Sequence, residues 1–327
     1  MKTRDQLLSL LLKSNDYVSG EAIASILGIS RNAVWKATNS LSESGIKIDT
    51  KPNKGYKLAE NINFVNKVVI DEYLNDDFYD VEVVDSLPST STYLKENQSS
   101  FKEGKVVFAR MQTEGRGRLN RTFYSPKDKG LYFSVLVRPK TNIASSIYLT
   151  VLSAVSVFDA VYEQLGIKLA IKWVNDLYKD NHKVVGILSE GSINIDYKCL
   201  EYCVIGIGIN VLKPDNGYDE EIKSIATSLL DTASFDLNKL ASLVLKKFKK
   251  YYLEYLNGNY EFIDTYINNQ LLTGMLVKAI NLYNGEEEIV EVIKVNKDCS
   301  LQVKTLDGSI KDLNSGEVRL IINNENV

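Results

Sequence analysis

The segment Gly115-Arg116-Gly117-Arg118-Leu119-Asn120-Arg121 stands out in this 327-residue chain because arginines alternate with glycines in a run that favours neither a helix nor a strand. Glycine lets the backbone approach a ligand closely and adopt positive φ. Arginine presents a planar fork of donors that matches phosphate or carboxylate oxygens. The pattern predicts a loop that binds a polyanion such as a nucleoside triphosphate. A solvated basic loop, or one that contacts nucleic-acid backbone, is the alternative interpretation.

Three further motifs follow this loop. They are Lys172-Trp173-Val174-Asn175-Asp176, Lys183-Val184-Val185-Gly186-Ile187-Leu188-Ser189-Glu190 and Gly206-Ile207-Gly208-Ile209-Asn210-Val211. The sequence has no Gly-x4-Gly-Lys-Ser/Thr string, and its two Gly-x-Gly pairs lack the third glycine of a dinucleotide fingerprint. A protein of this kind that uses ATP must neutralise phosphate charge by another device. Arg116, Arg118 and Arg121 are suited to that role.

Composition limits the classes of protein that fit. Hydrophobic residues make up 44% and charged residues 25% of the chain, as in globular proteins, and the length predicts two or three domains. The net charge of −3 means that any basic function is local. Three cysteines give no disulfide framework, and the single histidine, His182, argues against a histidine-based catalytic set or a zinc site. With no signal-peptide pattern and no run as long as a membrane span, we expect a cytoplasmic protein without membrane association.

Residues 1–63 read as a separate winged helix-turn-helix domain. A helix–turn–helix pattern with a cap at Ser30 precedes two short strands, 46–49 and 55–58, which flank a turn at 52–54. Between Ser30 and Leu58 six basic residues face two acidic ones, which suits DNA phosphates. The candidate DNA contacts are Arg31, Asn32, Lys36, Lys51 and Lys54. A winged domain kept only for protein contacts remains the alternative, and Trp35 is as consistent with packing as with contact.

The rest of the chain predicts two more domains, so the fold class is α+β and multidomain. Residues 64–270 show strand patterns at 81–84, 105–109, 131–137, 169–173, 184–189 and 202–211, with a long apolar helix from about 145 to 165 and two closing helices after 240. Residues 271–327 carry hairpin signals at Tyr283-Asn284-Gly285 and Asp307-Gly308. We expect a small SH3-like β-barrel there.

In order and spacing, these motifs resemble those of biotin–protein ligases, over roughly Ser89–Val211. The N-terminal segment extends the resemblance to the bifunctional subgroup that also represses biotin genes. The resemblance implies a central domain of the class II synthetase-like, biotin–lipoate ligase type. It also implies that the chain uses ATP and Mg²⁺ to form biotinyl-5′-AMP. Biotin would then pass to a lysine of the biotin carboxyl carrier domain of acetyl-CoA carboxylase or pyruvate carboxylase.

The resemblance also assigns residues. Those implied to bind biotin are Ser89, Thr90, Ser91, Gln112, Gly115, Arg116, Gly117, Arg118, Lys183, Gly186, Gly206 and Gly208. Those implied to hold ATP or the adenylate are Arg116, Arg118, Arg121, Phe123, Lys172, Asn175, Asp176 and Asn210. The catalytic candidates are Lys183, Arg118 and Asp176, of which Asp176 either holds Mg²⁺ or orients the acceptor lysine. Ser91, Val174 and Phe123 depart from the family's asparagine, proline and tryptophan.

Two other functions fit the same fold. A lipoate–protein ligase would carry an Arg-Arg-x-x-Gly-Gly loop, which Gly115–Arg118 replaces here. A non-enzymatic biotin sensor with a winged domain would not need Lys183, Asp176 and the whole arginine loop. In the repressor subgroup, closure of the loop over the adenylate favours a homodimer through the central sheet. Two winged domains then reach the two half-sites of an operator DNA.

Overall fold

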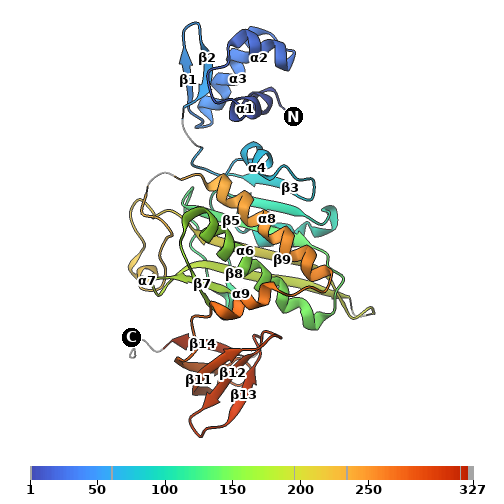
Figure 1. The fold of residues 1–327 in the computed structure, drawn as a ribbon, viewed down its shortest axis with the longest axis vertical. Coiled ribbons are helices and arrows are strands. Elements are labelled where there is room, and N and C mark those ends of the chain that lie inside the picture. Colours follow the sequence, from blue (N-terminus) through green and yellow to red (C-terminus); the bar gives the residue numbers. More distant parts are fainter. Residues whose placement is uncertain (1, 60–61, 195, 233–234, 317, 323–327) are drawn as a thin grey trace.

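The computed structural model describes residues 2–322 apart from 60–61, 195, 233–234 and 317. Three parts follow one another along the long axis of the molecule: a helical N-terminal part, a central sheet with helices packed on it, and a strand-rich C-terminal part (Figure 1). The N-terminal and C-terminal parts lie at opposite ends. The domain limits 1–63, 64–270 and 271–327 stay predictions.

The N-terminal part contains the expected helix-turn-helix followed by a hairpin. Its elements are α1 (Thr3–Leu12), α2 (Gly20–Leu27), α3 (Arg31–Glu43), β1 (Ile48–Lys51) and β2 (Gly55–Leu58). Gly28 ends α2 with a left-handed φ of 65°, and Ser30 Oγ accepts a hydrogen bond from Ala33 N at 3.2 Å at the start of α3. The buried residues of α3 are Val34, Ala37, Thr38 and Leu41, so its opposite face is free of the core.

A short helix that the sequence did not suggest, α4 (Lys67–Leu74), joins the N-terminal part to the central one. Its Val69 packs into the core of the N-terminal part, whereas Ile70 and Leu74 belong to the main core. The linker before it is fixed by Asn238, whose side chain is wholly buried. Asn238 Oδ1 accepts from Asn66 N at 2.7 Å, and Nδ2 donates to the carbonyls of residues 62 and 64 at 3.1 and 3.0 Å.

Seven strands form the central sheet in the order β3-β4-β5-β9-β8-β7-β6. They are β3 (Asp80–Val84), β4 (Lys105–Ala109), β5 (Gly130–Val137), β6 (Ala170–Lys172), β7 (Asp176–Lys179), β8 (His182–Asn194) and β9 (Cys199–Asn210). Strands β3 and β4 are parallel, and all other neighbours are antiparallel.

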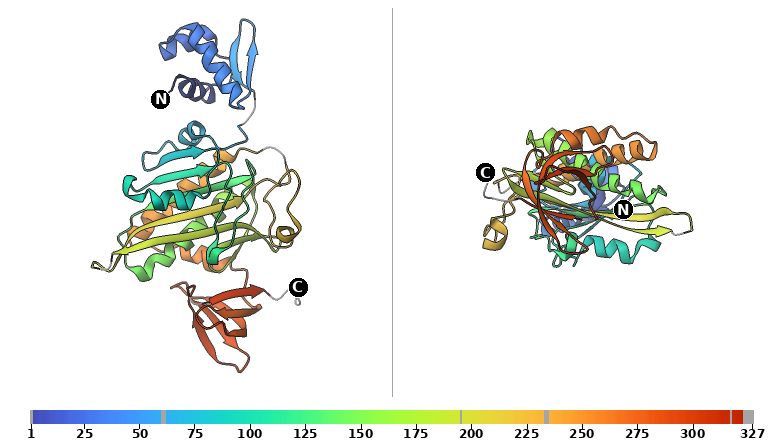
Figure 2. Two further views of the ribbon diagram at one scale, coloured as in Figure 1. Left: turned by 180° about the vertical axis from the view of Figure 1, so that it is seen from behind. Right: turned by 90° about the horizontal axis from the view of Figure 1, so that it is seen from below.

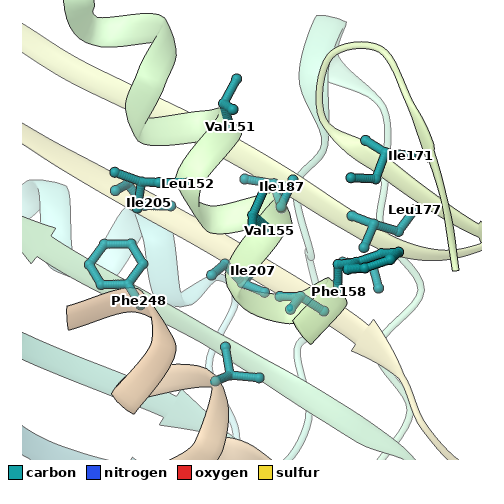
Figure 3. Close-up of a cluster of buried hydrophobic side chains, with 14 of the residues drawn as sticks. Val151, Leu152, Val155, Phe158, Ile171, Leu177, Ile187, Ile205, Ile207 and Phe248 are labelled. Atoms are coloured by element: carbon teal, nitrogen blue, oxygen red, sulfur yellow. The ribbon is translucent and has the colours of Figure 1, made fainter. Parts of the chain in front are cut away.

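Helices α6 (Ile147–Leu165), α8 (Leu237–Leu256) and α9 (Phe262–Asn268) cover one face of the sheet, and α5 (Thr90–Glu96) lies on the other (Figures 1 and 2). The segment Ile143–Leu165 is long and apolar enough to cross a membrane by length and composition. In the structure, however, its helix packs against the sheet: Val151, Leu152 and Val155 lie beside isoleucines of β8 and β9 (Figure 3). An apolar surface on nearly every side is expected of a helix in the middle of a core.

Strand β1 begins two residues later than the predicted 46–49, and larger differences occur at two places in the central sheet. Strand β7 was not predicted, because its four residues include only one fully buried side chain, Leu177. Strands β8 and β9 extend as a hairpin well past the predicted 184–189 and 202–211. The added residues are mostly polar and partly exposed, so they carry no apolar pattern that periodicity could detect.

The C-terminal part is a five-stranded antiparallel sheet in the order β13-β12-β11-β10-β14. Its strands are β10 (Leu276–Asn281), β11 (Glu287–Val295), β12 (Leu301–Thr305), β13 (Ile310–Leu313) and β14 (Val318–Ile322). Both predicted hairpins form. Trp173 is buried, and its Nε1 donates to Cys299 O at 2.8 Å, which ties this sheet to the central part. Closure into an SH3-like barrel stays a prediction.

Replacement of Asn238 by alanine would leave three buried backbone groups of the linker without partners. We expect Asn238→Ala to lower the free energy of unfolding by about 2–3 kcal/mol and to increase the radius of gyration, since the linker loses its attachment. Chemical denaturation and X-ray scattering measure the two effects. Asn257→Ala, which removes an exposed hydrogen bond to Leu253 O at the end of the same helix, is the control. Equal stability of both variants would contradict this role.

Candidate ligand site and nucleic-acid interface

Three glycines leave a strip of the central sheet without side chains. Gly186 on β8 is the cross-strand partner of Gly208 on β9, and Gly206 lies two residues earlier on the same face. A Cβ atom on Gly206 would lie 2.4 Å from Ser91 Oγ, and one on Gly208 would lie 2.5 Å from the Phe123 ring. Close approach by neighbouring groups, and not positive φ, therefore requires glycine here.

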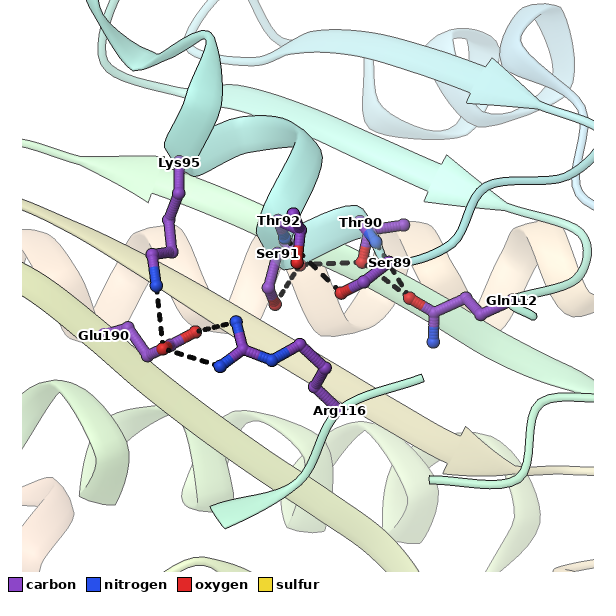
Figure 4. A network of polar contacts seen from close by, with 9 residues as sticks. Ser89, Thr90, Ser91, Thr92, Lys95, Gln112, Arg116 and Glu190 are labelled. Atoms are coloured by element: carbon purple, nitrogen blue, oxygen red, sulfur yellow. Dashed lines mark hydrogen bonds and ion pairs between the residues drawn. The ribbon is translucent and has the colours of Figure 1, made fainter. Parts of the chain in front are cut away.

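A cluster of hydroxyl and amide groups lies above this strip. Ser134, fully buried on β5 opposite Gly206, contacts Thr90 Oγ1 at 2.8 Å and Ser91 Oγ at 2.9 Å. Gln112 Oε1 accepts from Thr90 N at 2.9 Å (Figure 4). Such groups offer both donors and acceptors to a polar ring. Sequence reasoning missed Ser134, although a lone serine inside the apolar strand 131–137 was a usable signal.

These groups surround a small, partly open cavity. Its lining residues are Ser89, Thr90, Ser91, Gln112, Arg116, Phe123, Phe133, Gly186, Gly206, Ile207 and Gly208. Most of the residues that the resemblance assigned to biotin thus meet in one cavity. Gly115, Gly117, Arg118 and Lys183 do not line it.

Residues 112–125, here called the flap, form a hairpin-like loop over the cavity. Gln112 N donates to Ser125 O at 3.2 Å, and Phe123 N donates to Gly115 O at 2.7 Å. Of the two properties that glycine offers, the flap does not use positive φ: neither Gly115 nor Gly117 has it, whereas Leu119 has a φ of 56°. Gly115 is needed for space instead, because a Cβ there would lie 2.2 Å from Phe123 O.

A group of cations lies next to the cavity. Lys183 Nζ, at the start of β8, is 2.7 Å from Asp176 Oδ1, although the angles are not those of a directed hydrogen bond. Burial lowers the pKa of Lys172, and the charges of Lys183, Arg121 and Arg319 lower it further, while Asp176 opposes them. An accumulation of positive charge around one carboxylate is a site prepared for an anion.

Arg118 connects the flap to this group and to the C-terminal sheet. Its Nη1 donates to Asn175 Oδ1 at 3.3 Å, and its Nη2 donates to Ser315 O at 2.6 Å. Burial lowers the pKa of the guanidinium, against the attraction of Asp176. No motif in the sequence placed Ser315 or Arg319 here, because both belong to a separate part of the chain.

The other predicted residues lie around these two clusters. Asn175 lies between β6 and β7, and its Nδ2 donates to Ile187 O at 2.8 Å. Asn210 is buried at the end of β9, on the same face as Gly208, and Arg121 is exposed on the flap. Phe123 lies against both Gly186 and Gly208.

The chemistry of Asp176 suits Mg²⁺ only as a companion of phosphate. Among the residues that the structure describes, no three His, Cys, Asp or Glu side chains gather as a metal site. Asp176 Oδ1 is buried and faces Lys183. Mg²⁺ commonly keeps several waters and takes one or two carboxylates besides substrate phosphates, and one carboxylate beside a cation group fits that mode.

The outer face of α3 carries the predicted DNA contacts. Arg31, Asn32 and Lys36 are exposed, and so is Trp35, whose side chain is 55% exposed. Packing is therefore not the role of Trp35. Lys51 and Lys54 are exposed at the hairpin tip, where Lys51 Nζ lies 4.7 Å from the ring centre of Tyr17. Arg31 pairs with Glu21 at 2.8 Å.

The fold and the two sites define a protein that joins a small-molecule site of a ligase type to a helix-turn-helix. Residues 83–210 match the model of the biotin/lipoate A/B protein ligase family, and residues 3–57 match that of an HTH domain. The chain is 30% identical to the bifunctional ligase/repressor BirA of Bacillus subtilis (strain 168), over 97% of this chain and 98% of that protein. It is also 30% identical to the Escherichia coli (strain K12) protein of that name, over 96% of both.

A solved structure agrees with these matches. Biotin protein ligase from Aquifex aeolicus, in complex with biotin and ATP, superposes with a TM-score of 0.65 and 29% identity, over 75% of this chain and 100% of that chain. The chain belongs to the biotin/lipoate A/B protein ligase family.

Lys172 lowers the stability of the ligand-free protein, because its charge is partly buried among other cations. We expect Lys172→Met to raise the melting temperature of the ligand-free protein by about 2–4 °C, or about 1 kcal/mol, but to weaken ATP binding at least tenfold. Because the pKa of Lys172 is lowered in the folded state, its destabilising effect is full at neutral pH and disappears as the pH rises towards the unfolded value near 10.5. The gain in stability should therefore shrink with rising pH. Calorimetry at two pH values checks this, and a variant less stable than wild type at neutral pH would contradict it.

Proposed function

We propose that this chain is an ATP-dependent biotin–protein ligase that also represses transcription of biotin genes in response to biotin. It forms biotinyl-5′-AMP and passes biotin to a lysine of a biotin carboxyl carrier domain, in acetyl-CoA carboxylase or pyruvate carboxylase. The observation that carries the proposal is the glycine-floored cavity beside the Lys183–Asp176 and Arg118 group, in one chain with the exposed basic face of α3. We place this activity in the cytoplasm.

The cavity suits the head of biotin. A ureido group has one acceptor oxygen and two N–H donors, and Ser134, Thr90, Ser91 and Gln112 supply matching partners within one hydrogen-bonded cluster. Ser91 stands where relatives carry asparagine, and its bond to Ser134 fills part of that role. Phe133 and Ile207 add apolar wall for the sulfur-containing ring and the side chain.

The cation group suits the first reaction. A carboxylate oxygen of biotin attacks the α-phosphorus of ATP, and pyrophosphate leaves with the electron pair of the broken P–O bond. Lys183 and Arg118 offset the repulsion between the two anions and stabilise the charge of the transition state. Lys172, Arg121 and Arg319 add positive charge where the phosphates lie. Mg²⁺ bound to the phosphates would supply further charge, with Asp176 as its protein ligand.

The second reaction releases AMP. The acceptor lysine amine attacks the acyl carbon of the adenylate, the bond from that carbon to the phosphate oxygen breaks with its electron pair going to AMP, and the amine proton passes to water. Asp176 lies beside Lys183 and can orient the incoming amine. Phe123, held against Gly208, offers its ring to adenine, with less area than a tryptophan would have.

The regulatory half of the proposal rests on two further surfaces. Arg31, Asn32, Lys36 and Trp35 on α3 face a DNA major groove, and Lys51 and Lys54 of the hairpin contact phosphates. Strand β8 is the second surface. Pairing with β7 ends at Gly186, so in the described segment 188–194 only β9 is its strand neighbour. That edge can pair with a second copy when the adenylate is bound, or with the carrier domain.

Three structural assignments belong to the same proposal. The central part is of the class II synthetase-like ligase type, the C-terminal strands close as an SH3-like barrel, and the domains span 1–63, 64–270 and 271–327. The antiparallel order of β10–β14 supports the barrel.

Pyrophosphate release tests the enzymatic half. Release that depends on ATP and biotin, but not on lipoate, supports a biotin ligase. Release with lipoate alone would indicate a lipoate–protein ligase, and biotin binding without release would indicate a sensor. The regulatory half is tested by operator binding with and without both substrates.

Lys183 acts mainly in the transition state in this account. We expect Lys183→Met to slow adenylate formation by about 10²–10³-fold while the dissociation constant for biotin changes by less than about threefold. Single-turnover kinetics and calorimetric titration measure the two. The control is Lys179, which lies on neighbouring β7 and donates a hydrogen bond to Leu229 O. Lys179→Met should change neither the rate of adenylate formation nor the dissociation constant for biotin. An equal loss in biotin affinity and in rate would show that Lys183 only binds substrate.

Trp35 should contact base edges, because an exposed indole on the outer face of α3 can pack on thymine methyl groups. We expect selection from a random-sequence DNA duplex library, with biotin and ATP present, to yield a palindrome with wild type. Trp35→Ala should lose preference at one or two positions of each half-site, by about 1–3 kcal/mol each. Tyr283→Ala, an exposed aromatic at the far end of the molecule, is the control. An unchanged selected sequence for Trp35→Ala would contradict the contact.

A further inference from the structure

A carboxylate outside the proposed chemistry, Glu190 on β8, connects the flap to the rim of the cavity. Alternation along β8 places Glu190 on the same face as Gly186, the face that carries the cavity. Its Oε2 accepts from Arg116 Nη1 at 3.3 Å, and its Oε1 accepts from Arg116 Nη2 at 3.4 Å (Figure 4). Lys95 Nζ donates to Oε1 at 2.8 Å. One carboxylate thus joins three separate elements.

The elements joined are those that enclose the cavity. Lys95 lies at the end of α5, the helix whose first turn carries Thr90 and Ser91. Arg116 lines the cavity from the flap, and β8 supplies Gly186 to its floor. The shorter contact to Lys95 fixes the carboxylate so that it faces Arg116.

The flap needs such a contact. Arg116 stands between two glycines, and its backbone is bridged to Thr122 of the flap itself, which does not tie it to the central sheet. The base of the flap is held at residues 112 and 125, and its tip is held by Arg118 through Asn175 and Ser315. Between base and tip, the side of the flap nearest Ser91 is bound to the sheet by the Arg116–Glu190 pair.

We propose that Glu190 is a positioning residue that holds Arg116 across the mouth of the cavity, so that the flap slows the escape of biotin and biotinyl-adenylate. This inference rests on the proposed biotin ligase function. The Arg116 and Glu190 side chains are 38% and 23% exposed, and a pair of that kind is weak. A weak ion pair suits a flap that must open for each substrate, because a strong buried pair would also block entry.

Dissociation rates test this role of the Arg116–Glu190 pair. With wild type preloaded with labelled biotin, or with adenylate formed from biotin and ATP, an unlabelled biotin chase gives the rate of escape. We expect Glu190→Gln to accelerate both escapes about 2- to 5-fold, with a much smaller change in the rate of adenylate formation at saturating biotin. Lys95→Met should act in the same direction but less, since it only orients the carboxylate.

A double-mutant cycle separates positioning from a general structural effect. If Glu190 acts through Arg116, Glu190→Gln should add nothing in an Arg116→Gln background. The control is Glu287→Gln, which removes another partly exposed pair, with Lys278 at 2.8 Å on β10 and β11, remote from the cavity. It should leave the escape rates at their wild-type values, and melting temperatures verify folding.

Two results would overturn the inference while leaving the ligase assignment intact. One is an escape rate in Glu190→Gln equal to that of wild type. The other is the same acceleration in the presence and absence of Arg116. A wild-type protein that binds no biotin would instead contradict the proposed function itself.

Discussion

The structure depends on a place in the central sheet where side chains are missing. Gly186, Gly206 and Gly208 lie together on β8 and β9, so groups from elsewhere can approach the backbone of the sheet. Ser91 and Phe123 occupy that space from α5 and the flap. A side chain at Gly206 or Gly208 would displace them, because a Cβ atom would lie 2.4 Å from Ser91 Oγ or 2.5 Å from the Phe123 ring. The cavity, its polar rim and its cover all follow from this one strip.

Burial of cations in the charged half of the site destabilises the ligand-free protein, and the rest of the fold offsets this effect. Lys172 and Arg118 are both partly buried, and burial lowers the pKa of each. Asp176 compensates part of that charge, and the large apolar core around α6 stabilises the scaffold that holds it. An arriving anion would then meet cations that have already lost part of their water, which is how a preorganised site gains its strength.

The sequence predicted the fold best where one residue decides the local geometry. Ser30 predicted the start of α3, because a helix cap depends on one side chain and leaves a direct mark in the sequence. Strand β7 and helix α4 were missed because both are short and mix polar with apolar residues. Their secondary structure is decided by the elements against which they pack.

For the site, the motif residues could be named from resemblance, but their neighbours could not. Ser134 is separated from Thr90 by 44 residues, and Ser315 from Arg118 by 197. Contacts over such separations are set by the order of strands and by the packing of the C-terminal sheet. The sequence also left open whether the flap glycines provide close approach or positive φ, and the structure shows that Gly115 provides steric room.

The central claim is that biotin lies in the cavity beside the glycine strip, with its carboxylate directed at Lys183 and Arg118. A crystal structure of the protein with biotin and a non-hydrolysable ATP analogue tests this most directly. The account predicts the ureido ring within hydrogen-bond distance of Thr90, Gln112 or Ser134, and the carboxylate between Lys183 and the α-phosphate. Biotin bound away from Gly206 and Gly208, or with its carboxylate remote from Lys183, would contradict it.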